Sequence, residues 1–215
     1  MRAANVKTMD RGKFITVEGG EGVGKSTNID LVCDLIRQSG HAVLQTREPG
    51  GTPIAERIRA LLLEHGDEAL PDDAELLLFF AARSLHINNV IRPAIEAGTW
   101  VVCDRFTDAT RAYQGGGRGL DAARIETLAE WVHGDMQPEL TILLDAPAGV
   151  GRERAESRGK ADRLETEQAA FHDRVRQAYL KQAAAEPERF QVIDASEPLP
   201  HVQAQIARAM LRVLS

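Results

Sequence analysis

The hydrophobic pattern of the chain alternates between short apolar runs and longer segments of helical period. The short runs predict strands over Phe14–Glu18, Ala42–Thr46, Trp100–Cys103, Leu140–Leu144 and Phe190–Ile193. Apolar positions at helical spacing predict helices over Lys25–Gln38, Ile54–Glu64, Asp73–Ala97, Ala122–His133, Ala148–Ser157, Glu167–Ala185 and Leu199–Leu214. Strands that alternate with helices favour a parallel sheet that is covered on both faces. We therefore predict an α/β fold with a five-stranded parallel sheet and helices on both faces.

The size of the chain and its helix-stop signals indicate one domain. A chain of 215 residues with 43% hydrophobic residues can bury a substantial single core. Gly40, Gly98 and Gly134 follow predicted helices and favour their termination. The sequence contains no internal repeat and no low-complexity linker. We expect residues 1–13 to form a flexible tail and residues 14–215 to form a single domain.

Charge and cysteine content narrow the functional classes. The formal net charge is −6, from 26 basic and 32 acidic residues, so a long nucleic acid would meet no general basic field. Neither Cys33 nor Cys103 belongs to a C-x-x-C or Cys/His cluster, which is typical of small buried residues in a reducing compartment. The sequence has no apolar run of the roughly 20 residues that span a bilayer, and its first dozen residues lack the apolar centre of a signal peptide. We expect a cytoplasmic protein that binds neither nucleic acid nor membrane.

A phosphate-binding motif follows the first predicted strand. Residues 19–26 read GGEGVGKS and satisfy G-x-x-x-x-G-K-[ST], between the apolar strand FITVE and a helix, which is the context that the motif requires. The glycines let backbone N–H groups surround phosphate oxygens, Lys25 would reach the β- and γ-phosphates, and the Ser26 hydroxyl would ligate Mg²⁺. A glycine-rich turn with an incidental lysine is the alternative. The predicted ATP-binding residues are Gly19, Gly20, Glu21, Gly22, Val23, Gly24, Lys25, Ser26 and Thr27.

The phosphate loop alone leaves the class of nucleotide-binding protein open. A GTPase should carry an N-K-x-D motif, which this sequence lacks, and a helicase or motor normally needs a longer chain. The third predicted strand ends at Asp104 and Arg105, where ligands bind in open parallel sheets. Asp104 can contact a metal-bound water, and Arg105 can grip a phosphate with two hydrogen bonds. The alternative for this pair is an ordinary surface ion pair.

Two further clusters could bind the acceptor of the phosphate. Arg47 begins the segment REPGGT and could approach an anion, although the segment could equally be a charged loop. Phe79 and Arg83 stand four residues apart on a predicted helix and so share a face. Phe79 could stack on a base while Arg83 bonds its carbonyl edge, whereas in isolation a core phenylalanine beside a snorkelling arginine is the commoner arrangement. Phe80 is interpreted as core.

Together these motifs resemble the thymidylate kinase family. The resemblance rests on the segments EGGEGVGKST, TREPGGTP, LLFFAARSLH with VIRPAI, DRFTDATRAYQGGGRG and the lid-like RERAESRGKADRLE, in the order and spacing of that family. It covers nearly the whole chain from Phe14 onward. It implies a P-loop NTPase fold with a small lid over about residues 152–163, and transfer of the ATP γ-phosphate to dTMP, giving dTDP and ADP with Mg²⁺. It also implies a homodimer.

The resemblance assigns roles to individual residues. It implies that Glu21 contacts the deoxyribose, that Phe79 stacks on thymine and that Tyr113 crowds a 2′-hydroxyl. The implied dTMP-binding residues are Glu21, Arg47, Phe79, Arg83, Arg105, Thr110, Tyr113 and Gln114; the implied catalytic residues are Lys25, Asp104, Arg105 and Arg158; and the implied metal-binding residues are Ser26 and Asp104. Arg111 departs from the family pattern, and we expect it to face solvent.

Arginines in the lid-like segment are expected to supply charge for the transfer. Arg152, Arg154, Arg158 and Arg163 are concentrated there, and Gly159 offers a place to bend. A solvated helix with ion pairs to Glu153 and Glu156 is the alternative for Arg152 and Arg154. Position 22 is glycine where some thymidylate kinases place an arginine, so the loop cannot supply that charge itself. The resemblance therefore favours Arg158 as the catalytic cation.

Two other functions remain open from the sequence alone. Another nucleoside monophosphate kinase of the same fold would act on UMP, CMP or AMP. A non-catalytic nucleotide-binding switch would bind a nucleotide without transferring its phosphate, although the missing N-K-x-D motif counts against it.

Overall fold

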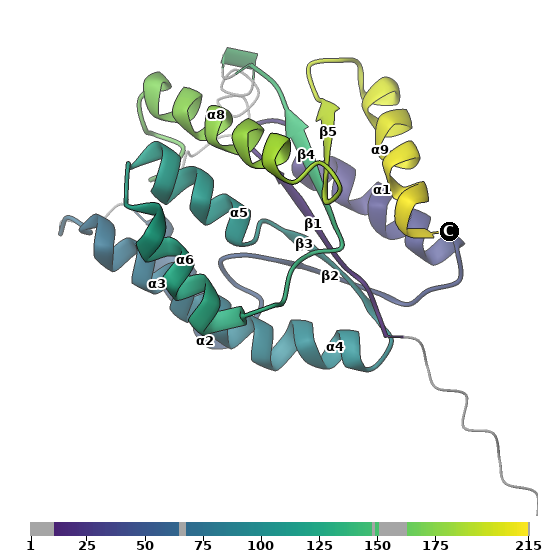
Figure 1. Cartoon of the computed structure of the whole chain (residues 1–215), viewed down its shortest axis with the longest axis horizontal. Helices are drawn as coiled ribbons and strands as arrows, with labels where there is room; N and C mark the ends of the chain where they lie inside the picture. Colours follow the sequence, from purple (N-terminus) through teal and green to yellow (C-terminus); the bar gives the residue numbers. More distant parts are fainter. Residues whose placement is uncertain (1–10, 65–67, 148, 151–162, 215) are drawn as a thin grey trace, which may run out of the picture.

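A parallel sheet forms the centre of the molecule (Figure 1). The computed structural model describes residues 11–64, 68–147, 149–150 and 163–214. Within these residues, five strands form one sheet in the order β2-β3-β1-β4-β5, and all neighbouring strands run parallel. The strands are β1 (Phe14–Gly19), β2 (Val43–Arg47), β3 (Trp100–Asp104), β4 (Leu140–Asp145) and β5 (Phe190–Asp194). The predicted fold class and all five predicted strands are confirmed.

Helices connect successive strands. Their bounds are α1 (Lys25–Gln38), α2 (Pro53–Leu63), α3 (Asp72–His86), η1 (Ile87–Ile91), α4 (Arg92–Glu96), α5 (Thr107–Thr110), η2 (Arg111–Gly117), α6 (Ala122–His133), α8 (Ala169–Ala185) and α9 (Leu199–Leu214). The segments labelled η are π-helical turns. The helices predicted over Lys25–Gln38, Ala122–His133 and Leu199–Leu214 have the bounds that were predicted. Most of the helix predicted over Ala148–Ser157 lies outside the described residues, as does the predicted lid apart from Arg163.

The two faces of the sheet carry different helices. On one face α1 and α9 pack side by side against the strands, as Figure 1 shows, and their apolar side chains share one core with Ile15 and Val17 of β1. On the other face α4, α5 and α8 contact the strands. Because side chains alternate along a strand, Thr16 and Glu18 of β1 point away from the α1 and α9 core. A buried carboxyl group, that of Glu18, therefore lies under the helices of the second face.

The register of the central strand determines where the site is built. Val17 of β1 pairs with Asp104 of β3, and Gly19 of β1 pairs with Leu144 of β4. The loop that follows β1 therefore leaves the sheet beside the end of β3. In an open parallel sheet this carboxyl edge is the place where ligands bind.

One predicted helix is interrupted. The sequence predicts a continuous helix over Asp73–Ala97, whereas the structure passes from α3 through the π-helical turn η1 into α4. Pro93 lies in the first turn of α4. Proline has no N–H and crowds the carbonyl four residues before it, so a regular α-helix could not pass through this position unchanged. The wider turn before Pro93 lets the chain remain helical.

One helical segment was missed by the sequence analysis. Residues Thr107–Gly117 form α5 and η2, although Gly115, Gly116 and Gly117 argue against a helix. Close packing explains these glycines. A Cβ atom on Gly116 would lie 2.5 Å from the Cβ of Ala178, and one on Gly117 would lie 2.5 Å from the ring of Phe171, both on α8.

The chain before β1 contacts the fold in its described part. The N–H of Gly12 donates to the carbonyl of Ile95 in α4 at 2.9 Å. This part of the predicted tail is thus held against the domain. Among the described helices, none has the length and apolarity that crossing a bilayer would need.

We predict that Gly116→Ala destabilises the protein by about 1–3 kcal/mol, because the added methyl meets Ala178 and overpacking has costs of this size. Gly115→Ala is the matched control, since its Cβ would lie 3.2 Å from the flexible Cδ1 of Ile125 and helix propensity favours alanine. Urea unfolding of both variants measures the free energy of unfolding. Equal values for the two variants would contradict close packing as the reason for Gly116.

Candidate functional site

The phosphate loop connects β1 to α1 and turns back on itself. Gly22 and Gly24 have φ angles of 68° and 89°, in the left-handed region that glycine adopts at little cost. The Nζ of Lys25 donates to the carbonyls of Gly19 at 3.2 Å and Gly20 at 2.7 Å. Burial, and then the charge of Arg105, lower the pKa of Lys25. The lysine is therefore held against the loop at the N-terminus of α1.

The end of β3 forms a strained turn beside this loop. Arg105 has a φ of 69°, which is unusual for a residue other than glycine. Its N–H donates to the carbonyl of Val17 at 3.1 Å, and the N–H of Phe106 donates to the buried carboxyl group of Glu18 at 2.7 Å. The hydroxyl of Tyr179 donates to the other Glu18 oxygen at 2.7 Å. Burial, together with the nearby charge of Asp108, raises the pKa of Glu18 to about 8.

The guanidinium group of Arg105 links the loop to the helices. It donates to the carbonyl of Gly19 at 3.0 Å, to the hydroxyl of Tyr179 at 3.3 Å and to the carboxylate of Glu21. Its central carbon lies 4.7 Å from the centre of the Tyr113 ring, and the Tyr113 hydroxyl donates to Glu21 at 2.7 Å. Burial alone would raise the pKa of Glu21, but Arg105 and Lys25 lower it to about 2. Glu21 is thus an ionised carboxylate that is held by hydrogen bonds from Arg105 and Tyr113 and stabilised by the charge of Lys25.

A cavity with a volume of about 200 Å³ extends from the phosphate loop toward α3 and η2. The predicted site residues that line it are Glu21, Gly22, Val23, Gly24, Lys25, Ser26, Phe79, Arg83, Asp104, Arg105, Thr110, Tyr113 and Gln114. Gly19 and Gly20 border a smaller cavity of about 50 Å³ on the side of the loop that faces α8. Most of the residues predicted from scattered motifs therefore meet at one place.

Arg83 reaches the cavity as a buried, oriented cation. Its Nε donates to Glu48 at 2.7 Å and its Nη2 donates to the hydroxyl of Thr110 at 3.1 Å. Glu48 also bonds the Nδ1 of His86 at 3.0 Å, and although burial raises its pKa, Arg83 lowers that pKa below its usual value. Among the described residues the Nη1 of Arg83 has no hydrogen-bond partner, although it is buried. A buried donor without a partner in a cavity wall is suited to a ligand oxygen.

Asp104 offers a matching acceptor at the loop. Its Oδ1 is buried and has no hydrogen-bond partner among the described residues. The side chain lines the same cavity as Ser26. An ionisable oxygen in this setting is suited to a cation or to a donor group of a ligand.

Two of the predicted residues, Arg47 and Thr27, do not line either cavity, and a third falls outside the described part of the chain. Arg47 is not one of the residues that line the cavity; its guanidinium pairs with Glu56 at 2.9 Å and its side chain is 53% exposed. Thr27 is exposed on α1 and does not line the cavity either. Arg158 lies outside the described residues.

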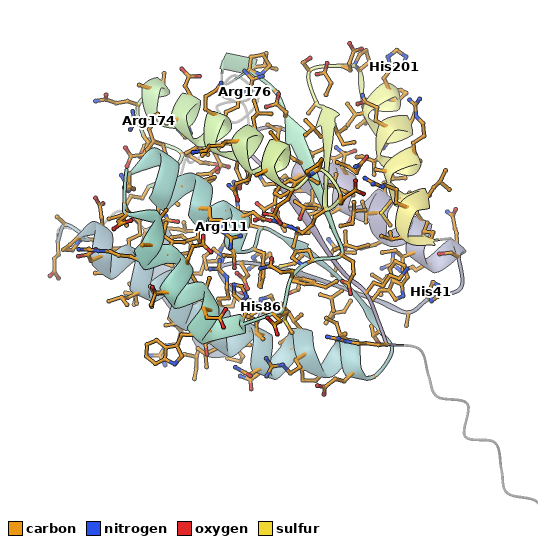
Figure 2. All side chains as sticks on the ribbon, in the orientation of Figure 1. His41, His86, Arg111, Arg174, Arg176 and His201 are labelled. Atoms are coloured by element: carbon orange, nitrogen blue, oxygen red, sulfur yellow. The ribbon has the colours of Figure 1, made fainter. Side chains whose placement is uncertain are left out.

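The expected exposure of Arg111 was wrong. Its side chain is 20% exposed and bonds Asp108 at 3.0 Å and both oxygens of Glu126 at 2.8 Å. Figure 2 labels Arg111 near the middle of the view and His201 at its edge. The carboxylate at position 108 explains the difference, because it is 1% exposed and needs cations near it.

The sequence analysis did not assign other residues that line the cavity, among them Glu48, Arg59 and Leu63. Arg59 and Leu63 stand four residues apart on a predicted helix, so helical spacing could have indicated a shared face. Glu48 lay within the quoted TREPGGTP segment and gave no such signal, because its partner Arg83 is 35 residues away.

Comparisons with known proteins establish the family of the chain. A family model described as thymidylate kinase matches residues 17–206. The thymidylate kinase of Chromohalobacter salexigens is 58% identical over 201 residues, which cover 93% of this chain and 95% of that protein. The thymidylate kinase of Pseudomonas fluorescens is 57% identical over 195 residues, which cover 91% and 93% of the two chains.

A solved structure shows the same likeness in three dimensions. The crystal structure of the thymidylate kinase from Ehrlichia chaffeensis aligns with a TM-score of 0.75 and 31% identity, covering 94% of this chain and 99% of that one. The family model covers most of the sequence, and the curated relatives match nearly their whole length. The chain therefore belongs to the thymidylate kinase family.

Proposed function

We propose that this protein transfers the γ-phosphoryl group of ATP to the phosphate of dTMP, giving ADP and dTDP. The observation that carries the proposal is that one cavity joins a phosphate loop to a pocket lined by Phe79, Arg83, Tyr113 and Gln114. The loop suits a triphosphate, and the pocket combines an aromatic ring with hydrogen-bonding groups for a nucleobase. The relatives named thymidylate kinase support this choice of acceptor.

On the donor side, the loop would bind the phosphates of ATP. Its backbone N–H groups and the N-terminus of α1 attract anions, and the Nζ of Lys25 can exchange its carbonyl partners for phosphate oxygens. Ser26 and Asp104 fit a Mg²⁺ site, since both line the cavity and the Oδ1 of Asp104 is buried without a partner among the described residues. Bound there, Mg²⁺ would offset negative charge on the phosphates.

On the acceptor side, dTMP would lie between α3 and η2. The ring of Phe79 would stack on thymine, and the unpartnered Nη1 of Arg83 would donate to a carbonyl of the base. Thr110 would act through Arg83, whose Nη2 it fixes at 3.1 Å. Arg105 would hold the dTMP phosphate, and Arg47 would join it by leaving Glu56.

The sugar would lie against Glu21 and Tyr113. These two side chains are joined by a hydrogen bond of 2.7 Å, so they present one fixed surface. Glu21 would accept from the 3′-hydroxyl, which its low pKa of about 2 permits at any ordinary pH. Tyr113 would occupy the space that a 2′-hydroxyl needs.

The chemical step would then depend on alignment. An oxygen of the dTMP phosphate bonds to the γ-phosphorus while the bond from that phosphorus to the bridging oxygen of ADP breaks, and ADP leaves with the electron pair. Lys25 and Arg105 would stabilise charge on the phosphoryl oxygens, and the walls of the cavity would exclude water. Because Gly22 brings no charge to the loop, we assign a further cation to Arg158.

We also propose that the protein acts as a homodimer in the cytoplasm. The exposed apolar side chains Leu61, Leu77 and Trp131, which are 66%, 57% and 82% exposed, come from α2, α3 and α6. These helices pack against one another, α2 on α3 and α3 on α6. Large exposed apolar side chains on neighbouring helices support an interface.

A substrate panel tests the function. We expect rapid turnover of dTMP with ATP and Mg²⁺ and slower turnover of dUMP. We expect at least about a hundredfold lower kcat/KM for CMP and AMP, because a site built to hydrogen-bond one base rejects others strongly, and a lower kcat/KM for UMP than for dUMP, because Tyr113 would occupy the space of the 2′-hydroxyl. A coupled assay of ADP formation measures each value. Preferential turnover of UMP, CMP or AMP would show that the acceptor is not dTMP. Nucleotide binding without any phosphate transfer would instead support the non-catalytic nucleotide-binding switch.

Arg158→Ala should lower kcat by roughly 10³-fold with little change in the KM for dTMP, since an arginine that acts on the transferring group contributes at about this level. Arg37→Ala is the matched control, because Arg37 is an exposed arginine paired only with its helix neighbour Asp34 among the described residues. Steady-state kinetics of both variants decide the matter. Normal turnover of Arg158→Ala would remove this residue from the mechanism.

For the homodimer we expect light scattering to give twice the monomer mass of 23.5 kDa at micromolar concentration. Trp131→Lys places a charge on the exposed apolar surface and should shift the measured mass toward that of the monomer. A monomeric wild-type protein would contradict the proposed assembly.

A further inference from the structure

A buried carboxylate on α3 lies next to the proposed base pocket without lining it. Glu75 is fully buried, and its Oε1 accepts a hydrogen bond of 2.7 Å from the Nε2 of Gln114 on η2. Its other bonds come from Arg118, at 3.3–3.4 Å, and from Arg163. These two cations and the amide of Gln114 lower the pKa of Glu75, although its burial raises that pKa. The group is thus a carboxylate that can only accept hydrogen bonds.

The carboxylate determines which way the Gln114 amide faces. An amide side chain carries a donor NH₂ group and an acceptor oxygen on the same carbon, and a buried one takes the orientation that its neighbours allow. Because Glu75 accepts only, it requires the NH₂ group of Gln114. Among the described residues nothing donates to the Oε1 of Gln114, and the side chain lines the cavity. The amide oxygen is therefore the group that remains for a ligand.

The pocket consequently presents one hydrogen-bond donor and one hydrogen-bond acceptor to the base, and neighbouring residues fix which group is which. The donor is the Nη1 of Arg83, which Glu48 and Thr110 leave unpartnered by holding the other nitrogens. The acceptor is the Oε1 of Gln114. Thymine and uracil carry a carbonyl oxygen beside a ring N–H, which complements this pair. Cytosine carries an amino group beside an unprotonated ring nitrogen, so both contacts would be mismatched.

We propose that Glu75 is a positioning residue that sets the specificity of the enzyme for thymine over cytosine by fixing the orientation of the Gln114 amide. The inference rests on the proposed function, since it concerns the base of the acceptor nucleotide. Glu75 does not touch the substrate. It acts through Gln114, whose amide would otherwise be free to turn its NH₂ group toward the base.

Glu75→Gln tests the proposal with an isosteric change. An amide at position 75 can donate to Gln114 as well as accept from it, so the orientation of Gln114 is no longer imposed. We expect the KM for dTMP to rise by about tenfold while kcat changes less, and the ratio between the inhibition constant of dCMP and the KM for dTMP to fall by at least tenfold, because mismatched buried polar groups cost factors of this size. This ratio is independent of the fraction of enzyme that is folded.

Two comparisons separate positioning from a structural role. Glu167→Gln removes a carboxylate that also pairs with Arg118 but does not touch Gln114, and it should leave the ratio unchanged. In a Gln114→Ala background, Glu75→Gln should not lower the ratio further, whereas a general loss of structure would act in both backgrounds. If Glu75→Gln does not fold, Glu75→Asp is the second variant. It keeps a negative charge to pair with Arg118 and Arg163, but its shorter side chain moves the carboxylate away from Gln114. It should therefore lower the ratio of the dCMP inhibition constant to the dTMP KM in the same way.

The outcomes distinguish this inference from the proposed function. A wild-type enzyme that does not phosphorylate dTMP overturns the proposed function. A wild-type enzyme that phosphorylates dTMP, with an unchanged ratio in folded Glu75→Gln or Glu75→Asp, overturns the role of Glu75 alone. An equal decrease of the ratio with and without Gln114 also overturns it.

Discussion

The rest of the site depends on the pairing of the guanidinium group of Arg105, which is largely shielded from water. Its backbone has a φ of 69°, a conformation that costs a residue with a side chain about 1–3 kcal/mol. Removing the guanidinium from water adds a further cost unless each donor finds a partner. The partners are a carbonyl at the end of β1, the carboxylate of Glu21 and the hydroxyl of Tyr179 on α8. The sheet edge, the phosphate loop and α8 therefore hold one another in place through this side chain.

The same requirement for pairing shapes the acceptor pocket. Arg83 and Glu75 are both on α3 and both buried, and each is compensated by opposite charges from other segments: Glu48 for Arg83, and Arg118 with Arg163 for Glu75. Removing one partner of such a pair leaves an uncompensated charge, which typically costs 3–5 kcal/mol. Full compensation also leaves few free polar atoms. The Nη1 of Arg83 is one of them, and its direction is determined by residues that a ligand need not touch.

The features that could be predicted from the sequence are those that depend on a periodic pattern or on a local motif. Alternating apolar segments gave the five strands and the class of the fold, and the glycine-lysine motif gave the phosphate loop, because both depend on neighbouring residues. Residues Thr107–Gly117 were missed since their glycines disfavour a helix locally, while packing against α8 requires them. The largely covered position of Arg111 and the pairing of Glu48 with Arg83 were missed for a related reason. Such pairs join segments that are far apart in the sequence, so no local sequence pattern predicts them.

The charges around the phosphate loop also explain why the loop cannot complete the site alone. Lys25 and Arg105 contribute two positive charges, and Glu21 and Asp104 contribute two negative ones, so this group is close to neutral. The acidic residues are needed, because without Glu21 the buried cations would lie side by side and repel each other. A triphosphate brings several negative charges into this balanced group, and Gly22 supplies none to offset them. Under the proposed function the compensating cations would come from outside the loop, as we propose for Arg158, and the unpartnered carboxylate oxygen of Asp104 would suit a cation that arrives with the nucleotide.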